Sequence, residues 1–179
     1  MLTSFAEACG ATPLTLVGHS LGGWLAMLLA LKHPERFKNL VLLNPAGVWT
    51  DGYEDVARAF DINSVADTRA LLQRLWFRLP WYVRPFINSV SEELQNRRVF
   101  ELIQNIGREE FVNDRLSGLP GRTSLIWGRE DQLLPRQTVD IFRHHLPGMG
   151  LTLIPRCGHV PQLECPRQTA EALRQALMQ

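Results

Sequence analysis

The stretch LTLVGHSLGG, from Leu14 to Gly23, places a serine between glycines after a short apolar run, and a second apolar segment follows it. This order of residue types predicts a strand, a sharp turn and a helix. A turn that exposes a serine hydroxyl at the end of a strand crowds its neighbours. Small residues are therefore needed two positions before and after the serine, where Gly18 and Gly22 stand. Ser20 is predicted to be a nucleophile.

The composition indicates one globular domain without a general affinity for polyanions. At 179 residues, the chain is long enough to bury roughly 70% of its unfolded surface. Lys plus Arg number 19 and Asp plus Glu 18, so the formal net charge of +1 gives no attraction to nucleic acid. The cysteines, Cys9, Cys157 and Cys165, are three in number and lack C-x-x-C spacing. Neither a disulfide framework nor a zinc site is predicted, and Cys157 is expected to be a buried small apolar residue.

The same features suggest a cellular location. A chain without disulfides is typical of a reducing compartment. The longest apolar stretch, Leu21–Leu31, is too short to cross a bilayer, and Met1 is not followed by a signal-type segment. These observations predict a soluble, cytoplasmic protein.

Strand and helix signals alternate in the first and last parts of the chain. The apolar run Leu14–Val17 lacks alternation with polar residues, which is typical of a parallel strand covered on both faces. The expected strands are 14–17, 39–43, 122–127 and 151–154, and the expected helices are 2–9, 21–33, 137–146 and 166–178. Strand, helix and strand at this spacing form a right-handed parallel crossover. We therefore expect an α/β fold with about four parallel strands.

The middle of the chain has a different pattern. Between about residues 50 and 116 no strand-like run occurs, and apolar residues recur at helical spacing. Ser91, followed by two glutamates, predicts the start of a helix. The chain is thus divided into a first core part (1–49), a helical insertion (50–117) and a second core part (118–179).

Residues able to support nucleophilic catalysis follow the last two predicted strands. Asp131 comes after the third strand and His159 after the fourth. The carboxyl ends of parallel strands share one edge of a sheet, so both residues are expected near Ser20. A serine needs a neutral imidazole to take its proton, and a carboxylate orients that imidazole. The chain order Ser, Asp, His is that of the α/β-hydrolase fold.

Three segments resemble the signature blocks of serine α/β-hydrolases: GHSLGG at 18–23, WGRED at 127–131 with Pro135, and CGH at 157–159 with Pro161 and Glu164. The resemblance implies an α/β-hydrolase core without cofactor or metal. It implies a triad of Ser20, Asp131 and His159, and an oxyanion donor in the backbone N–H of Leu21. Position within the second block favours Asp131 over its neighbour Glu130.

The helical insertion, through LWFRLP at 75–80, resembles the cap of monoacylglycerol-lipase-like esterases. A serine at the turn argues against relatives with an aspartate nucleophile, such as haloalkane dehalogenases. Trp76, Trp81 and the elbow residue His19 are the expected substrate-binding side chains, with packing against the elbow as the alternative for His19. Whether or not the cap contacts a membrane, an apolar acyl pocket is expected between cap and sheet.

Arginines and aromatic residues alternate in the insertion, and no acidic residue occurs between Arg69 and Val90. Such a surface can rest on an anionic membrane. The favoured alternative is a cap whose arginines are simply solvated.

The beginning of the chain departs from the family. Members carry several strands before the nucleophile strand, and a loop after one of them supplies the second oxyanion donor. Here 13 residues precede Leu14, so the strand 14–17 is expected to present an unpaired apolar edge. We expect the C-terminal part of a longer enzyme, or a chain that needs a partner to supply those strands.

The sequence predicts a serine hydrolase of small-molecule carboxylic esters, such as monoacylglycerols, acting through an acyl-enzyme. One alternative is hydrolysis of a carbon–carbon bond in a dienone ring-cleavage product. Another is a non-catalytic fragment or ligand-binding module that retains the triad residues without a complete oxyanion hole.

Overall fold

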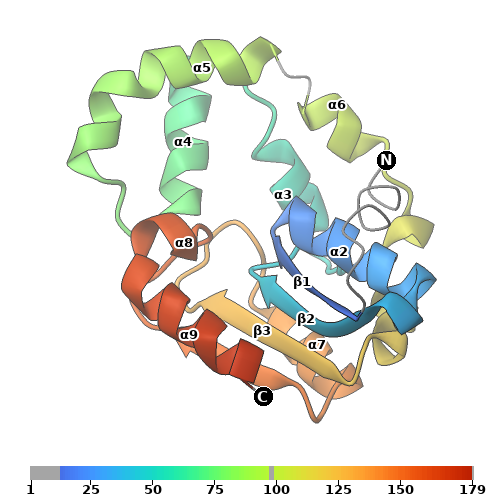
Figure 1. Cartoon of the computed structure of the whole chain (residues 1–179). Helices are drawn as coiled ribbons and strands as arrows, with labels where there is room; N and C mark the ends of the chain where they lie inside the picture. The colour runs from blue at the N-terminus through green and yellow to red at the C-terminus, as the bar shows by residue number, and fades with distance from the viewer. Residues whose placement is uncertain (1–12, 97–98, 179) are drawn as a thin grey trace.

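The computed structural model describes residues 13–96 and 99–178. Its centre is a parallel sheet of four strands in the order β1-β2-β3-β4 (Figure 1). The strands are β1 (Leu14–His19), β2 (Phe37–Leu43), β3 (Arg122–Gly128) and β4 (Gly150–Ile154). The predicted α/β fold with a four-stranded parallel sheet is confirmed. The expected helix at 2–9 lies outside the described residues, as does Cys9.

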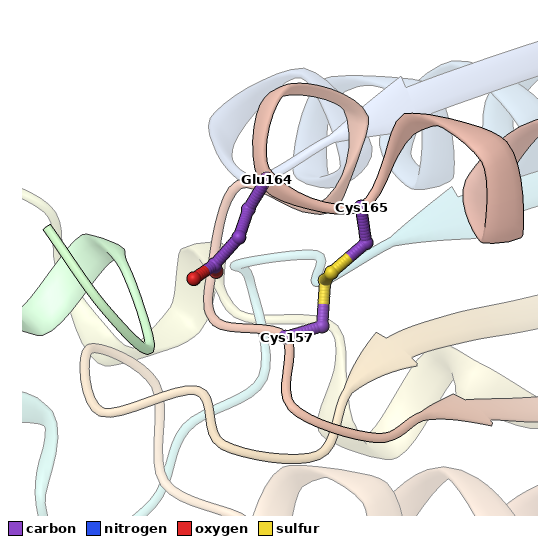
Figure 2. A group of neighbouring side chains, drawn as sticks. All are labelled: Cys157, Glu164 and Cys165. Atoms are coloured by element: carbon purple, nitrogen blue, oxygen red, sulfur yellow. A yellow bond between two sulfur atoms is a disulfide. The ribbon is translucent and has the colours of Figure 1, made fainter. Parts of the chain in front are cut away.

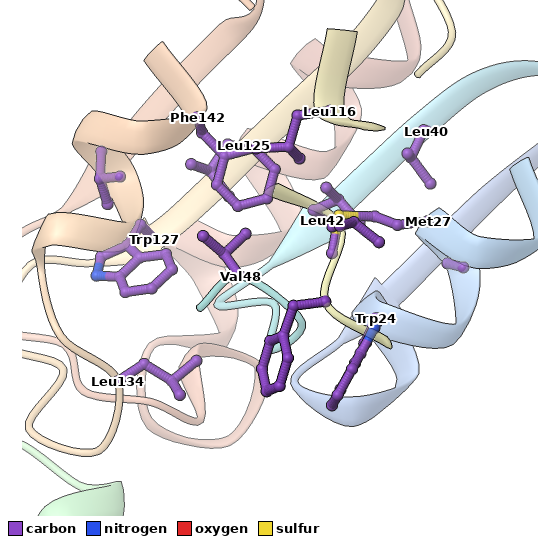
Figure 3. Packing of buried hydrophobic residues seen from close by; sticks show 14 of the residues in the cluster. Trp24, Met27, Leu40, Leu42, Val48, Leu116, Leu125, Trp127, Leu134 and Phe142 are labelled. Atoms are coloured by element: carbon purple, nitrogen blue, oxygen red, sulfur yellow. The ribbon is translucent and has the colours of Figure 1, made fainter. Parts of the chain in front are cut away.

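Helices cover both faces of the sheet because successive strand residues point to opposite sides. Leu40 and Leu42 of β2 pack with α2 (Leu21–Lys32) and α7 (Gln137–His145), as Figure 3 shows. Val41 and Leu43 pack instead with α9 (Pro166–Met178). Burial on both faces explains why β2 reads as a continuous apolar run.

The regular elements in the described part of the insertion between β2 and β3 are all helical. Its elements are α3 (Tyr53–Arg58), α4 (Val65–Leu75), η2 (Trp81–Phe86), α5 (Ile87–Asn96), α6 (Val99–Gln104), η3 (Arg108–Glu110) and η4 (Asn113–Gly118). Figure 1 shows α4 and α5 at the top of the molecule, away from the sheet. The remaining elements are η1 (Pro34–Arg36), after α2, and α8 (Pro161–Glu164), before α9.

The predicted helix start at Ser91 is wrong. Helix α5 begins at Ile87, directly after the turns of η2, and Ser91 lies inside it. The Ser91 side chain is buried, and its hydroxyl accepts a hydrogen bond from Gln95 Nε2 over 2.8 Å. Because a partner one turn later satisfies the hydroxyl, Ser91 does not need a capping position.

Strand β1 lies at the edge of the sheet, and within the described chain it pairs only with β2. Coverage of both its faces was predicted and is wrong for Val17, which is 53% exposed. Leu21 and Leu25 on α2 are exposed as well, so this helix is not buried all round. We call these three exposed apolar side chains, one on β1 and two on α2, the β1 edge patch.

No helix within residues 13–96 and 99–178 has both the length and the apolar character needed to span a bilayer.

Candidate active site

The turn after β1 has the strained backbone that the serine–glycine pattern predicts. Ser20 has φ 51° and ψ −123°, a left-handed conformation that side chains rarely adopt. A Cβ at Gly18 would lie 2.6 Å from the carbonyl oxygen of Gly22, and a Cβ at Gly23 would lie 2.7 Å from Pro45 Cβ. Only glycine fits at these positions.

The steric role predicted for Gly22 is wrong for the described chain. A Cβ at Gly22 would meet no heavy atom within 4 Å. The second crowded glycine is Gly23, where the loop after β2 approaches the first turn of α2. The sequence pattern therefore identified the turn correctly but assigned the close contact to the neighbouring glycine.

Ser20, His159 and Asp131 form one continuous chain of hydrogen-bonding groups. His159 Nε2 lies 2.9 Å from Ser20 Oγ, and His159 Nδ1 lies 2.8 Å from Asp131 Oδ2. The side chains of His159 and Asp131 are buried. Because Nδ1–H donates to the carboxylate, Nε2 of the neutral imidazole is free to accept the serine proton.

Backbone and side-chain donors converge on the Asp131 carboxylate. Oδ1 accepts hydrogen bonds from the N–H groups of Leu133 and Leu134, at 2.8 and 3.0 Å. Oδ2 accepts from Asn44 Nδ2 at 2.6 Å as well as from His159. These bonds hold the carboxylate as an oriented anion in a buried position.

Asn44 is the orienting residue that the sequence analysis missed. It follows β2 in a left-handed conformation with φ 38°, and its side chain is fully buried. Its Oδ1 accepts from the N–H of Gly128 at 3.1 Å, so the amide bridges the ends of β2 and β3 to Asp131. Its position at the carboxyl end of a predicted strand was the available signal.

Glu130, the rival acid, has a different partner. Its Oε2 accepts a hydrogen bond from the N–H of Cys157 over 3.1 Å. The carboxylate that receives the imidazole N–H of His159 is that of Asp131. Glu130 instead joins the loop after β3 to the loop after β4.

The expected oxyanion donor lies beside the serine. Leu21 is the first residue of α2, so its N–H has no intrahelical acceptor. Leu21 and Ser20 both line a cavity of about 190 Å³ between the sheet and the helical insertion. A carbonyl oxygen entering this cavity would meet a helix N-terminus, which favours developing negative charge.

The cavity lining is almost entirely apolar. Residues from the sheet loops and from the insertion share it; they include Trp24, Val48, Val56, Phe60, Ile103, Ile106, Phe111, Leu133 and Leu134. Among the polar lining groups, Tyr53 donates its hydroxyl to the carbonyl of Ile103 over 3.2 Å, and burial raises the pKa of Tyr53. Such a lining suits an apolar substrate group.

The three side chains expected to bind substrate lie outside this lining. Trp81 is 78% exposed on η2, and Trp76 is half-buried at the end of α4. His19 Nε2 lies 2.8 Å from the carbonyl oxygen of His159, and its Nδ1 lies 3.2 Å from Gln162 Nε2. Burial lowers the pKa of His19, so it is a neutral support of the histidine loop.

The absence of a disulfide was predicted and is wrong. Cys157 and Cys165 form one, which joins the loop after β4 to the start of α9 (Figure 2). The spacing of the two residues gave no signal because the pairing depends on how the loop and α8 fold back. This finding removes the cysteine argument for a reducing compartment, which was one of the observations behind the predicted location.

The same cysteines and Glu164 place their ligand-type atoms within 4.8 Å of one another. Both sulfurs are bonded to each other, and the Glu164 carboxylate accepts three backbone N–H groups. In this state the group offers no free thiolate to a metal ion.

Comparison with known proteins places this geometry among hydrolases. The model of the alpha/beta hydrolase family matches residues 2–172. A 2-hydroxymuconate semialdehyde hydrolase of Pseudomonas sp. (strain CF600) is 32% identical over 83% of this chain and 56% of its own length. A monoacylglycerol lipase, abhd6-A of Xenopus laevis, is 26% identical over 94% of this chain and 56% of its own length. The chain thus spans little more than half of these relatives.

Solved structures give the same picture of the fold. A membrane phospholipase A, described as a bacterial virulence factor, superposes with a TM-score of 0.84 at 28% identity. The match covers 98% of this chain and 60% of that one. A 2-hydroxy-6-oxo-6-phenylhexa-2,4-dienoate hydrolase from Rhodococcus sp. strain RHA1 superposes with a TM-score of 0.83 at 21% identity, over 99% of this chain and 68% of that one.

Proposed function

Because the chain belongs to the alpha/beta hydrolase family, we propose that it is a serine hydrolase that cleaves carboxylic esters through an acyl-enzyme on Ser20. The observation that carries this proposal is the hydrogen-bonded chain Ser20–His159–Asp131, whose serine lines an apolar cavity. A strained serine, an imidazole in hydrogen-bond contact with it and a buried carboxylate together form the arrangement that nucleophilic acyl transfer needs.

In the proposed reaction, Ser20 Oγ attacks the ester carbonyl carbon while His159 Nε2 takes the hydroxyl proton. The negative charge that develops on the carbonyl oxygen is stabilised by the N–H of Leu21. Asp131 stabilises the imidazolium, which then protonates the departing alcohol. A water molecule, deprotonated by His159, attacks the acyl-enzyme; the acid leaves and Ser20 regains its proton.

The substrate we propose is a medium- or long-chain acyl ester such as a monoacylglycerol. The apolar cavity beside Ser20 would hold the acyl chain, and the insertion would act as a cap over it. Lipase relatives support this class of substrate.

The 32% identity to a 2-hydroxymuconate semialdehyde hydrolase favours a second candidate function, hydrolysis of a carbon–carbon bond in a dienone acid. Turnover of a monoacylglycerol and of a dienone acid, measured side by side, separates the two.

We further propose that another strand pairs with β1 and brings the second oxyanion donor. The β1 edge patch supports this, because an apolar edge strand offers unpaired backbone groups to a neighbour. The strand would come from a further segment of the protein or from a partner chain.

The alternative to a hydrolase is a ligand-binding module. A folded chain that binds apolar ligands without turning over activated esters would support that alternative.

Contact with a membrane is proposed at η2. Trp81, Tyr82 and Phe86 are exposed there; Arg84 lies between Tyr82 and Phe86 in sequence, and Arg78 precedes Trp81 by three residues. Aromatic side chains beside arginines suit the surface of anionic lipids. Co-sedimentation with phosphatidylglycerol vesicles should fall in Trp81→Ala/Phe86→Ala and should not fall in the matched double variant Leu163→Ala/Leu177→Ala, whose residues are exposed elsewhere. Equal sedimentation of all three proteins would contradict the proposal.

The first test of the hydrolase proposal is covalent labelling with a fluorophosphonate, read as intact mass. We expect the chain and its Ser117→Ala control, altered at an exposed serine, to gain one phosphonyl group, and Ser20→Ala to gain none. A folded chain that stays unlabelled would overturn the proposal for this chain.

A further inference from the structure

The carboxylate of Glu164 joins two segments that are distant in sequence. Its Oε2 accepts hydrogen bonds from the N–H of Gly158 at 2.6 Å and of Phe77 at 3.1 Å. Its Oε1 accepts from the N–H of Arg78 at 3.0 Å. Gly158 belongs to the histidine loop, residues 156–160, and Phe77 and Arg78 belong to the stretch after α4 in the helical insertion. Figure 2 shows Glu164 leaving the end of α8 beside the disulfide.

The two segments also touch directly. The N–H of His159 donates to the carbonyl of Leu75 over 2.8 Å. A Cβ at Gly158 would lie 2.7 Å from both the Leu75 oxygen and the Phe77 nitrogen, so the loop has no space for a side chain there. The histidine loop therefore rests against the backbone of residues 75–77, and Glu164 supplies the acceptors for the N–H groups that meet at this junction.

We propose that Glu164 is a positioning residue: by bridging Gly158 to Phe77 and Arg78, its carboxylate fixes the histidine loop to the insertion and so sets the distance between His159 and Ser20. This inference rests on the proposed function and assigns a role to a residue that the hydrogen-bonded triad does not include. Hydrogen bonds from backbone N–H groups to a charged carboxylate are stronger than neutral ones, which suits such a bridge.

Apart from the direct bond from His159 to Leu75, two further contacts hold the loop. The disulfide holds Cys157, and His19 holds the carbonyl of His159. Neither contact reaches the insertion. Removing the carboxylate would leave the Phe77 and Arg78 N–H groups without this acceptor, and the bond from His159 to Leu75 would then hold the loop against α4 without the support of Glu164.

Two substitutions of Glu164 separate the effect of the carboxylate's charge from the effect of the side chain's length. In Glu164→Gln, one amide oxygen can still accept from Gly158, but the amide nitrogen faces a backbone N–H and cannot accept. Glu164→Asp keeps the charge on a shorter side chain that does not span all three donors. Glu171→Gln is the matched control, because Glu171 is an exposed carboxylate on α9 whose partners are Arg174 and Gln175.

The first measurement is hydrogen exchange by mass spectrometry, which does not depend on activity. In Glu164→Gln, peptides covering 75–78 and 157–159 should exchange at least about tenfold faster than in the unaltered chain, whereas Glu171→Gln should match the unaltered chain. Unchanged exchange in both segments would overturn the proposal, whether or not the chain reacts with any substrate.

The second measurement is fluorophosphonate labelling of Ser20. Both Glu164 variants should label about 10²-fold more slowly at saturating probe, because small misplacements of reacting groups carry costs of that size. The probe concentration at half-saturation should stay within about twofold, because residues 75–78 do not line the cavity. Normal labelling with raised exchange would reduce Glu164 to a structural role and overturn the inference. If the unaltered chain does not label at all, the proposed function fails, and hydrogen exchange alone decides on the bridge.

Discussion

The adjacent carboxylates Glu130 and Asp131 differ in function because they receive different donors. Asp131 receives the imidazole N–H of His159, and Glu130 receives the backbone N–H of Cys157. In Asp131→Asn, the amide nitrogen can turn toward Nδ1 and favour the wrong imidazole tautomer, so kcat/KM for a chromogenic ester should fall about 10⁴-fold. Glu130→Gln keeps an acceptor oxygen and should lose no more than about tenfold. The reverse order of losses would assign the orienting role to Glu130.

Burial of His19 makes stability depend on pH in a defined direction. Its pKa in the folded chain is lowered from the ordinary value of 6.5, so below that pH the unfolded chain binds a proton that the folded chain does not. The free energy of unfolding should therefore fall as the pH drops below about 6.5.

His19→Gln removes this titration while its amide can still donate to the His159 carbonyl. Denaturant unfolding at pH 7.5 and 5.0 should show a smaller loss of stability for His19→Gln than for the unaltered chain. His144→Gln, at an exposed histidine of α7, is the control and should behave like the unaltered chain. An identical loss in all three proteins would mean that His19 does not carry the effect.

The sequence allowed single residues to be assigned where local steric crowding limits which amino acids fit. The strained turn at Ser20 leaves a glycine signature, and chain order then indicated Asp131 and His159. Asn44 could not be recognised in this way, because its role depends on β2 lying next to β3. The contacts of Glu164 likewise depend on the insertion returning to the histidine loop.

At the scale of elements, the four strands and the helices α2, α7 and α9 were predicted within two residues, whereas the short η1 and α8 were not predicted. Continuous apolar runs determine buried parallel strands, and proline or glycine limits the helices. Boundaries inside the insertion were less accurate, as Ser91 illustrates. Ser64 caps α4, but α3 begins without a side-chain cap, so local signals carry less information about such short helices.

The disulfide between Cys157 and Cys165 is the element-scale feature that cysteine number failed to predict. It closes a loop with a sequence separation of 8 residues, next to α8. Constraining a loop of this length in the unfolded chain should contribute about 2–3 kcal/mol to the free energy of unfolding. Denaturant unfolding with and without dithiothreitol should show this difference. The free energy of unfolding of the Cys157→Ser/Cys165→Ser variant should not change with the reductant. If that of the unaltered chain does not change either, the prediction is contradicted.

At the scale of the whole molecule, the strands of the sheet differ in how far their side chains are exposed to solvent. Strands β2 and β3 are buried between helices, whereas β1 has an exposed Val17 and the adjacent α2 exposes Leu21 and Leu25 of the β1 edge patch. The sequence predicted this edge only through the resemblance to longer hydrolases, because an apolar run reads the same in a central strand and in an edge strand. Which strand pairs with the outer side of β1 depends on the assembled protein and cannot be inferred from the apolar sequence of β1.

An open apolar edge predicts association of the chain with itself. Within residues 13–96 and 99–178, β1 has a strand partner on one side alone. Its other side can pair with a second copy, which would also cover Val17, so the sedimentation coefficient should rise with protein concentration. Val17→Lys places a charge on the edge strand and should lower the association at equal concentration. Leu177→Lys, at a similarly exposed position on α9, should leave it unchanged. A chain that sediments as a monomer at every concentration would show that the edge is not open in solution, and it would remove the main support for a further strand beside β1.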